Sequence, residues 1–232
     1  MLYIELFVIL LLLIFTPIVL LVRRVLRPCI ISYPWPRVKD MIDKKKVVQQ
    51  EIEKNETVIF AGSFNPPHHG HLAMLVYLAE RFGQVIAVVG VNKNKTYNVS
   101  PEFRARLITK MIKETHSISN RLKSKIQVEV VSGYIWRFGF KQRASSFFRG
   151  IRSWEKDGKD EQHLLGLNTW GPIVYGPMKW PLPTTFLEGD PRYNHVSSTL
   201  IRDLCKGGKK RDDEYDLSTL IPKCIVEEVV KS

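Results

Sequence analysis

The stretch that decides the fold reads Gly62-Ser63-Phe64-Asn65-Pro66-Pro67-His68-His69-Gly70-His71-Leu72. It joins an apolar run rich in β-forming residues, TVIFAG at 57–62, to a segment with apolar residues at helical spacing over about 70–82. This pattern predicts a buried strand, a polar loop and a helix. In an open α/β sheet, a loop at the carboxyl end of a strand is where ligands bind.

The same alternation of strand and helix patterns continues along the chain. Apolar runs predict further strands at 84–91, 125–131, 145–150 and 184–188. Ser100-Pro101-Glu102 has the features of a helix start: an N-cap, a proline in the first turn and an acid. Short apolar strands separated by helices predict an α/β fold, a doubly wound, Rossmann-like parallel sheet of about five strands.

The loop after the first predicted strand carries groups suited to phosphate. His68 and His71 are three residues apart around Gly70, so both rings can face one phosphate from the first helical turn, while His69 should point elsewhere. Gly62 and Gly70 let a ligand approach the backbone closely, and a helix start favours an anion. Metal binding is the alternative, but with His69 pointing elsewhere no further His, Cys or carboxylate lies nearby in the sequence to complete a site.

Two later motifs fit the same chemistry. Arg149-Gly150-Ile151-Arg152 ends the fourth predicted strand, and Val196-Ser197-Ser198-Thr199-Leu200-Ile201-Arg202 opens a late helix. The arginines could bind phosphate or pair with acids, and Ser197 would cap the helix in any protein. Together with the histidine loop, these motifs indicate a site for phosphorylated ligands.

The three motifs resemble those of the nucleotidyltransferase superfamily, the H-x-G-H adenylyl- and cytidylyltransferases. Arg149-Gly150-Ile151-Arg152 and the serine-rich helix start are most similar to bacterial-type phosphopantetheine adenylyltransferases. The resemblance runs from about Val58 to Val230. It implies transfer of adenylyl from ATP to 4′-phosphopantetheine, which gives dephospho-coenzyme A and pyrophosphate, with Mg²⁺ accompanying the ATP. The attacking phosphate is largely ionised at neutral pH, so no general base is needed.

The resemblance also assigns roles to individual residues. Catalytic roles fall on His68, His71, Lys95 and Arg152, with Lys93 as a neighbour that competes for the position of Lys95. Substrate-binding roles fall on Ser63, Phe64, Lys95 and Arg149. Nucleotide-binding roles fall on Gly62, Gly70, His71, Gly150, Arg152, Glu161, Ser197, Ser198 and Thr199.

Two stretches depart from the pattern of that family. The stretch from Arg152 to Glu161 is one residue longer than usual, so Asp160 could take the acidic position instead of Glu161. The segment 169–183 holds four prolines and three large aromatic residues, and we interpret it as a variable loop, a membrane-facing rim or an oligomer contact.

Other functions remain open at this point. Nicotinamide or nicotinate mononucleotide adenylyltransferases share the histidine loop and the late helix, and membrane-associated lipid-pathway cytidylyltransferases share H-x-G-H. A third alternative is a catalytically inactive, membrane-tethered scaffold that binds nucleotide. Intact His68, His71, Lys95 and Arg152 argue against such decay.

The amino-terminal part has a different character. Leu2–Val22 is almost wholly apolar, long enough to span a bilayer, and is followed by Arg23, Arg24 and Arg27. We interpret residues 1–22 as a single-pass transmembrane anchor, 23–54 as a basic juxtamembrane linker and 55–232 as the nucleotidyltransferase domain. Basic residues after the apolar run predict that this domain faces the cytosol. A cleaved signal peptide is the alternative.

Composition limits the partners. The formal net charge is +12, and residues 55–232 retain +8 from 26 Lys and Arg against 18 Asp and Glu. Such an excess favours polyanionic partners, which the motifs identify as ATP and phosphopantetheine and not nucleic acid. The three cysteines form no C-x-x-C pair, so a disulfide scaffold or a structural zinc site is not expected. A homo-oligomer is compatible with the sequence.

Overall fold

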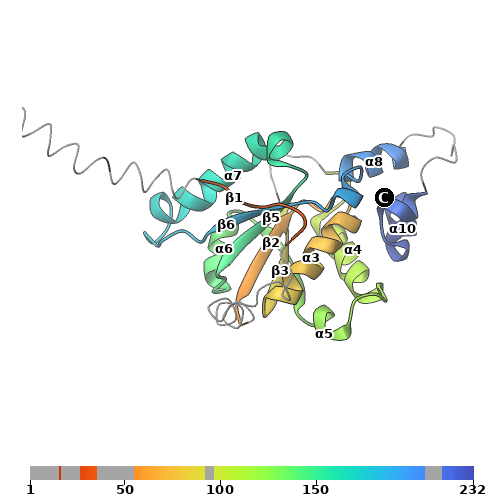
Figure 1. Ribbon diagram of the computed structural model, residues 1–232, viewed down its shortest axis with the longest axis horizontal. Helices are drawn as coiled ribbons and strands as arrows, with labels where there is room; N and C mark the ends of the chain where they lie inside the picture. Colours follow the sequence, from red (N-terminus) through yellow and green to blue (C-terminus); the bar gives the residue numbers. More distant parts are fainter. Residues whose placement is uncertain (1–15, 17–26, 36–54, 92–96, 207–215) are drawn as a thin grey trace, which may run out of the picture.

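A single parallel sheet forms the centre of the molecule (Figure 1). The computed structural model describes residue 16 and residues 27–35, 55–91, 97–206 and 216–232. In these parts of the chain the sheet has six strands in the order β1-β6-β5-β2-β3-β4, every pair of them parallel. The predicted α/β class and parallel sheet are confirmed.

The strand bounds follow the apolar runs closely. The strands are β1 (Cys29–Ile31), β2 (Thr57–Gly62), β3 (Gln84–Val91), β4 (Ile126–Ser132), β5 (Ser146–Ile151) and β6 (Thr184–Glu188). The predicted number of about five is one too low. The sixth strand, β1, lies in the stretch predicted as a juxtamembrane linker and pairs with β6, with Cys29 opposite Thr185. Three residues are too few to show a strand period, so the pattern could not reveal it.

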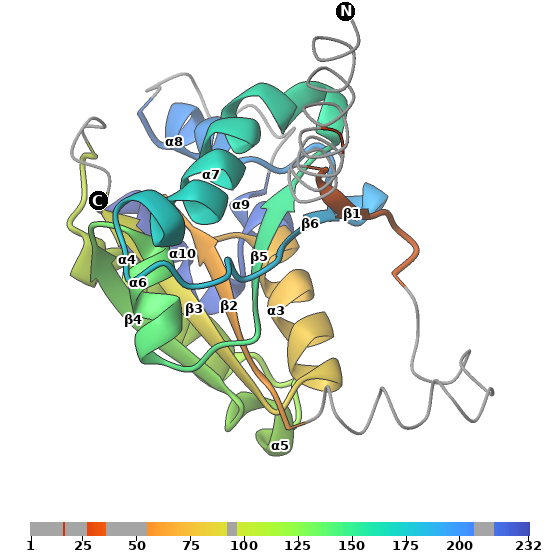
Figure 2. The same cartoon turned by 90° about the vertical axis from the view of Figure 1, so that its left-hand side faces the viewer.

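Helices cover both faces of the sheet (Figure 2). They are α3 (His69–Arg81), α4 (Pro101–Glu114), α5 (Asn120–Lys123), α6 (Ile135–Lys141), α7 (Trp154–Val174), α8 (Ser198–Lys206), α9 (Leu217–Leu220) and α10 (Lys223–Val230), with a 3-10 turn η2 (Pro191–Tyr193). Along β2, Val58 and Phe60 face the core with α3, α4 and α10, whereas Ile59 and Ala61 face the core with α6. This alternation is the two-sided burial of a doubly wound sheet.

Local sequence explains where helices begin and end. The Ser100 hydroxyl accepts a hydrogen bond from the Phe103 amide at 3.1 Å and caps α4, as the sequence predicted. Ser153 caps α7 in the same way. The interpretation of 169–183 as a loop needs correction, because α7 continues to Val174. Gly171 and Pro172 hide the helix pattern there, but the missing amide of Pro172 removes just one helical hydrogen bond near the end.

The strand order reverses beside β2. From β2 the chain winds outward through β3 to β4, then returns to the other side of β2 to form β5 and β6. The loops after β2 and β5 therefore lead in opposite directions. An open α/β sheet has its ligand-binding crevice at such a reversal, outside the carboxyl ends of the strands. We refer to this place between the ends of β2 and β5, which the strand order defines, as the crevice.

The predicted anchor at 1–22 lies outside the described residues apart from Thr16, and the predicted linker does so apart from 27–35. Within the parts of the chain that the structure describes, no helix combines the length and the apolar character needed to cross a membrane.

Candidate active site

The loop from β2 to α3 places a hydroxyl at the crevice. Ser63 is exposed directly after β2, while the Phe64 ring turns inward and is fully buried. Phe64 has a φ of +48°, and its ring lies so close to Gly62 that a Cβ there would approach it to 3.0 Å. The structure therefore gives the Phe64 ring a packing role beneath the loop, and the contact with substrate expected of this residue stays a prediction.

His71 is held in one tautomer. The backbone N–H of His68 donates to Nδ1 of His71 at 3.3 Å, so Nδ1 carries the lone pair and the ring proton is on Nε2. Burial, with smaller contributions from His68 and Arg149, lowers the pKa of His71 well below its usual value. The ring is therefore a neutral hydrogen-bond donor at physiological pH.

His68 and His69 have different surroundings. The ring centres of His68 and His71 are 3.7 Å apart. Burial, and to a smaller extent the charge of His69, lowers the pKa of His68 to about 3. Its buried Nδ1 has no hydrogen-bond partner among the described residues, and a Cβ on Gly70 would approach this atom to 3.1 Å. His69 turns away, with Nε2 3.2 Å from the carbonyl oxygen of Ser218, as predicted.

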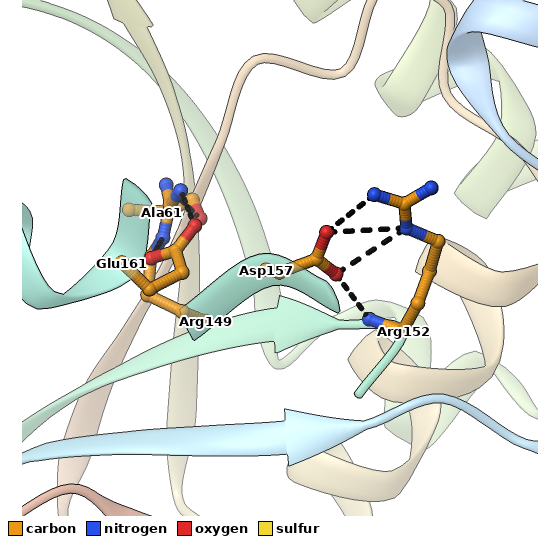
Figure 3. Close-up of polar contacts among 5 residues, drawn as sticks. All are labelled: Ala61, Arg149, Arg152, Asp157 and Glu161. Atoms are coloured by element: carbon orange, nitrogen blue, oxygen red, sulfur yellow. Dashed lines mark hydrogen bonds and ion pairs between the residues drawn. The ribbon is translucent and has the colours of Figure 1, made fainter. Parts of the chain in front are cut away.

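The side chain of Arg149, a residue of β5, forms an ion pair with an acid (Figure 3). Its Nε and Nη2 donate to the two carboxylate oxygens of Glu161 at 2.9 and 2.5 Å, and Nη1 donates to the Ala61 carbonyl oxygen at 3.0 Å. Asp160, the alternative acid, is exposed, whereas Glu161 is buried against Arg149. The bidentate pair ties β2, β5 and α7 together at the crevice.

Arg152 makes a second such pair (Figure 3). Its guanidinium donates to Asp157, and its backbone N–H donates to the same carboxylate at 2.7 Å. The guanidinium remains open to a ligand, because 54% of the Arg152 side chain is exposed. Burial raises the pKa of Asp157, but the hydrogen bonds and charge of Arg152 together outweigh it, so this pKa lies below its usual value. Both arginines thus have acidic partners, the alternative that the sequence left open.

The start of α8 closes over the same loop. Ser197 accepts from the Leu200 amide at 3.1 Å, which confirms its capping role. The Ser198 hydroxyl donates to the Pro66 carbonyl oxygen at 2.8 Å, and Thr199 accepts from Arg202 at 3.1 Å. Of the three hydroxyls predicted at the triphosphate, Ser198 is therefore engaged in joining α8 to the histidine loop.

The remaining predicted residues divide into two groups. Lys95 and its neighbour Lys93 lie outside the described residues. Gly150 lies in β5, where a Cβ would come within 2.5 Å of the Met74 sulfur. Its lack of a side chain thus allows α3 to pack closely against β5.

Arg104 was missed by the sequence analysis. This α4 arginine is fully buried, and its Nη1 donates to the Ser63 carbonyl oxygen at 2.5 Å. Its guanidinium lies 4.2 Å from the centre of the Tyr97 ring, and burial is the main cause that lowers its pKa. An arginine in an amphipathic helix is normally exposed to solvent, so only the three-dimensional structure reveals that Arg104 contacts the loop.

Metal ligands do not cluster in the described ranges. No group of three His, Cys, Asp or Glu side chains in them is placed to hold an ion.

Comparison with known proteins identifies related chains. A family model described as cytidylyltransferase-like matches residues 59–204. A phosphopantetheine adenylyltransferase of Actinobacillus pleuropneumoniae serotype 3 is 28% identical over 170 residues, which cover 73% of this chain and 94% of the relative. One from Nitrosomonas eutropha is 29% identical over 173 residues, 74% of this chain and 92% of the relative.

Among solved structures, a similar fold occurs in Plasmodium falciparum nicotinic acid mononucleotide adenylyltransferase complexed with NaAD. The TM-score is 0.53 at 16% identity, with 76% of this chain and 95% of that chain covered. At this identity the likeness concerns the fold alone.

Proposed function

Because the chain belongs to the cytidylyltransferase-like family, we propose that it transfers the adenylyl group of ATP to 4′-phosphopantetheine. The products are dephospho-coenzyme A and pyrophosphate. The observation that carries this proposal is the crevice between the adjacent strands β2 and β5. Ser63 and Arg152 directly follow these strands, Arg149 lies in the last half of β5, and His71 lies in the first turn of α3. Relatives named phosphopantetheine adenylyltransferase, which align with most of their own length, support this choice of acceptor.

The chemistry needs positioning and charge stabilisation more than proton transfer. An oxygen of the acceptor phosphate attacks the α-phosphorus of ATP, and the bond from that phosphorus to the oxygen bridging to the β-phosphate breaks. Pyrophosphate leaves with the electron pair. The acceptor phosphate enters as an ionised group at neutral pH, so no side chain has to remove a proton.

The neutral state of His71 suits this reaction. With the lone pair on Nδ1 occupied by the His68 amide, Nε2–H donates toward the phosphates as a fixed dipole. In this proposal Ser63 and His71 hold the reacting phosphates in line, and Arg152, with Lys95, spreads the developing charge. The half-exposed guanidinium of Arg152 can bind phosphate while Asp157 holds its other edge.

Arg149 and Glu161 act as a pair in the proposal. Because Glu161 already accepts two hydrogen bonds from Arg149, it orients this guanidinium toward the pantetheine side of the crevice. The Ser197 helix start lies over the histidine loop and would receive the β- and γ-phosphates. We expect Mg²⁺ to enter with ATP on its phosphate oxygens, which are ligands that this ion prefers.

A nicotinate mononucleotide adenylyltransferase is the second candidate, because enzymes of that kind share the histidine loop and the late helix start with this chain. The two reactions give different nucleotide products. The full chain is therefore incubated with ATP or CTP and, in turn, with phosphopantetheine, nicotinate mononucleotide or choline phosphate, and the products are identified by mass spectrometry. Dephospho-coenzyme A formed from ATP supports the proposal. Nicotinate adenine dinucleotide alone, or a CDP-linked product alone, would overturn it.

A further inference from the structure

Exposed large apolar residues lie at the end of α7 and in the segment between α7 and β6. Met178, Trp180 and Tyr175 expose 82%, 68% and 63% of their surface, and Trp170, one helical turn before Val174, is also exposed. Large apolar side chains rarely lie so open in a group unless they meet a partner. Tyr175, Met178 and Trp180 sit in or beside a loop of prolines and glycine, so core packing does not account for them.

Cations lie among these rings. The Arg137 guanidinium donates to the Tyr175 carbonyl oxygen at 3.2 Å, and Nζ of Lys179 lies 5.6 Å from the centre of the Phe140 ring. No ion pair between described residues includes either cation. We refer to Trp170, Tyr175, Met178, Trp180, Arg137 and Lys179 as the aromatic–basic face.

The sequence around this face lacks acids altogether. No Asp or Glu occurs between Gln162 and Leu187 or between Val130 and Trp154, whereas Arg137, Lys141, Arg143 and Lys179 fall within these stretches. A surface of Trp, Tyr, Met and cations has the composition of residues at a bilayer interface, where rings enter the headgroup region and cations meet anionic lipids.

The position of the face supports the same partner. Cys29 of β1 pairs with Thr185 of β6, so the chain enters the sheet from Arg27 at the end where Trp180 and β6 begin. In Figure 1 the start of β1, the end of α7 and the start of β6 gather on the left-hand side. The apolar stretch Leu2–Val22 precedes Arg27 by only five residues, which span at most about 18 Å.

We propose that the aromatic–basic face binds the surface of an anionic lipid bilayer. The candidate active site stands at the carboxyl ends of β2 and β5, whereas Trp180 of the face precedes the amino end of β6, a strand parallel to both. Docking through Trp180 therefore leaves the crevice at the far end of the strands, where ATP reaches it. The proposal does not depend on which acceptor the enzyme uses.

Tryptophan quenching tests the proposal in the full chain. Vesicles of phosphatidylcholine and phosphatidylserine contain brominated phosphatidylcholine, which quenches only tryptophans at the lipid. We expect strong quenching of the wild type, most of which is lost in Trp170→Phe/Trp180→Phe and retained in Trp35→Phe, which changes a ring at the opposite end. We also expect weaker quenching as salt rises or phosphatidylserine is omitted.

Two results would overturn the proposal. One is equal quenching in the wild type and in Trp170→Phe/Trp180→Phe. The other is absence of quenching together with an oligomer that Trp180→Ser dissociates, which would assign the face to a second copy of the chain. Thermal melting of each variant shows that the fold is kept, since phenylalanine preserves an aromatic ring at all three positions.

Discussion

At the scale of single residues, the two histidines of the loop owe their chemistry to burial. His68 has a pKa of about 3 in the folded chain against 6.5 for a free side chain, and the pKa of His71 is lowered too. Their rings are thus neutral, and a neutral imidazole with a fixed tautomer donates one hydrogen bond in a set direction. The loop therefore offers a phosphate a neutral N–H donor and not a positively charged ring.

This burial makes folding stability depend on pH. Below pH 6.5 the unfolded chain binds a proton at His68 that the folded chain, with its pKa of about 3, does not bind, so stability falls as the pH drops through that window. We expect the loss between about pH 7.5 and about pH 5 to be larger in the wild type than in His68→Asn, by about 1–2 kcal/mol. Urea unfolding of both proteins at each of the two pH values measures this loss of stability. Parallel losses in the two proteins would show that His68 titrates normally.

Arg104 is a second residue whose role comes from its contacts. Its hydrogen bond to the Ser63 carbonyl oxygen fixes the loop from below. Arg104→Met leaves that oxygen without its donor, so we expect a loss of about 1–3 kcal/mol in unfolding free energy and a lower turnover. Arg106→Met is the matched control, because Arg106 lies exposed on the same helix. Equal stability of the two variants in denaturant titrations would show that Arg104 does not stabilise the loop.

At the scale of elements, strand β1 and the segment after it belong to the folded unit. Trp35 donates from Nε1 to the Glu188 carbonyl oxygen at 2.9 Å and packs against the Tyr77 ring, with 5.0 Å between the ring centres. These contacts join the segment after β1 to the end of β6 and to α3.

The effect of Trp35 on stability is therefore predictable. Trp35→Ala removes a partly buried hydrogen bond and a ring contact, and we expect a loss of about 3 kcal/mol in unfolding free energy, with a lower melting temperature. Trp180→Ala, at an exposed ring, should leave the melting temperature within about 1 °C of the wild type because surface changes cost little. The reverse order of the two melting temperatures would contradict the role given to β1.

The elements also show which parts of the fold were predictable. The strands from 57 to 188 follow from apolar runs, because buried strands need such runs whatever surrounds them. Strand β1 is too short for a pattern, and the end of α7 contains Gly171 and Pro172, which argue against a helix. The histidine loop and the Arg149–Arg152 motif lie at the carboxyl ends of β2 and β5, as the spacing predicted. The acidic partners of Arg149 and Arg152 depend on the turn into α7, which spacing alone does not reveal.

At the scale of the whole molecule, the proposed function and the proposed attachment occupy opposite ends of one sheet. The crevice lies at the carboxyl ends of the strands, where the order of the sheet reverses, and Trp180 of the aromatic–basic face lies before the amino end of β6. A parallel sheet makes this division natural, because every strand runs from one end to the other. The proposed cytosolic placement of the enzyme would expose the crevice to soluble ATP.

The central claim is that nucleotide transfer takes place at the crevice around His71, and one measurement tests it directly. Pyrophosphate release from ATP and phosphopantetheine is measured for the full-length wild type, His71→Ala and His69→Ala under the same conditions. We expect His71→Ala to lower turnover by about 10²–10³, as loss of a transition-state donor does. His69→Ala should retain activity close to that of the wild type, because that ring points toward Ser218. Wild-type turnover in His71→Ala would contradict the claim.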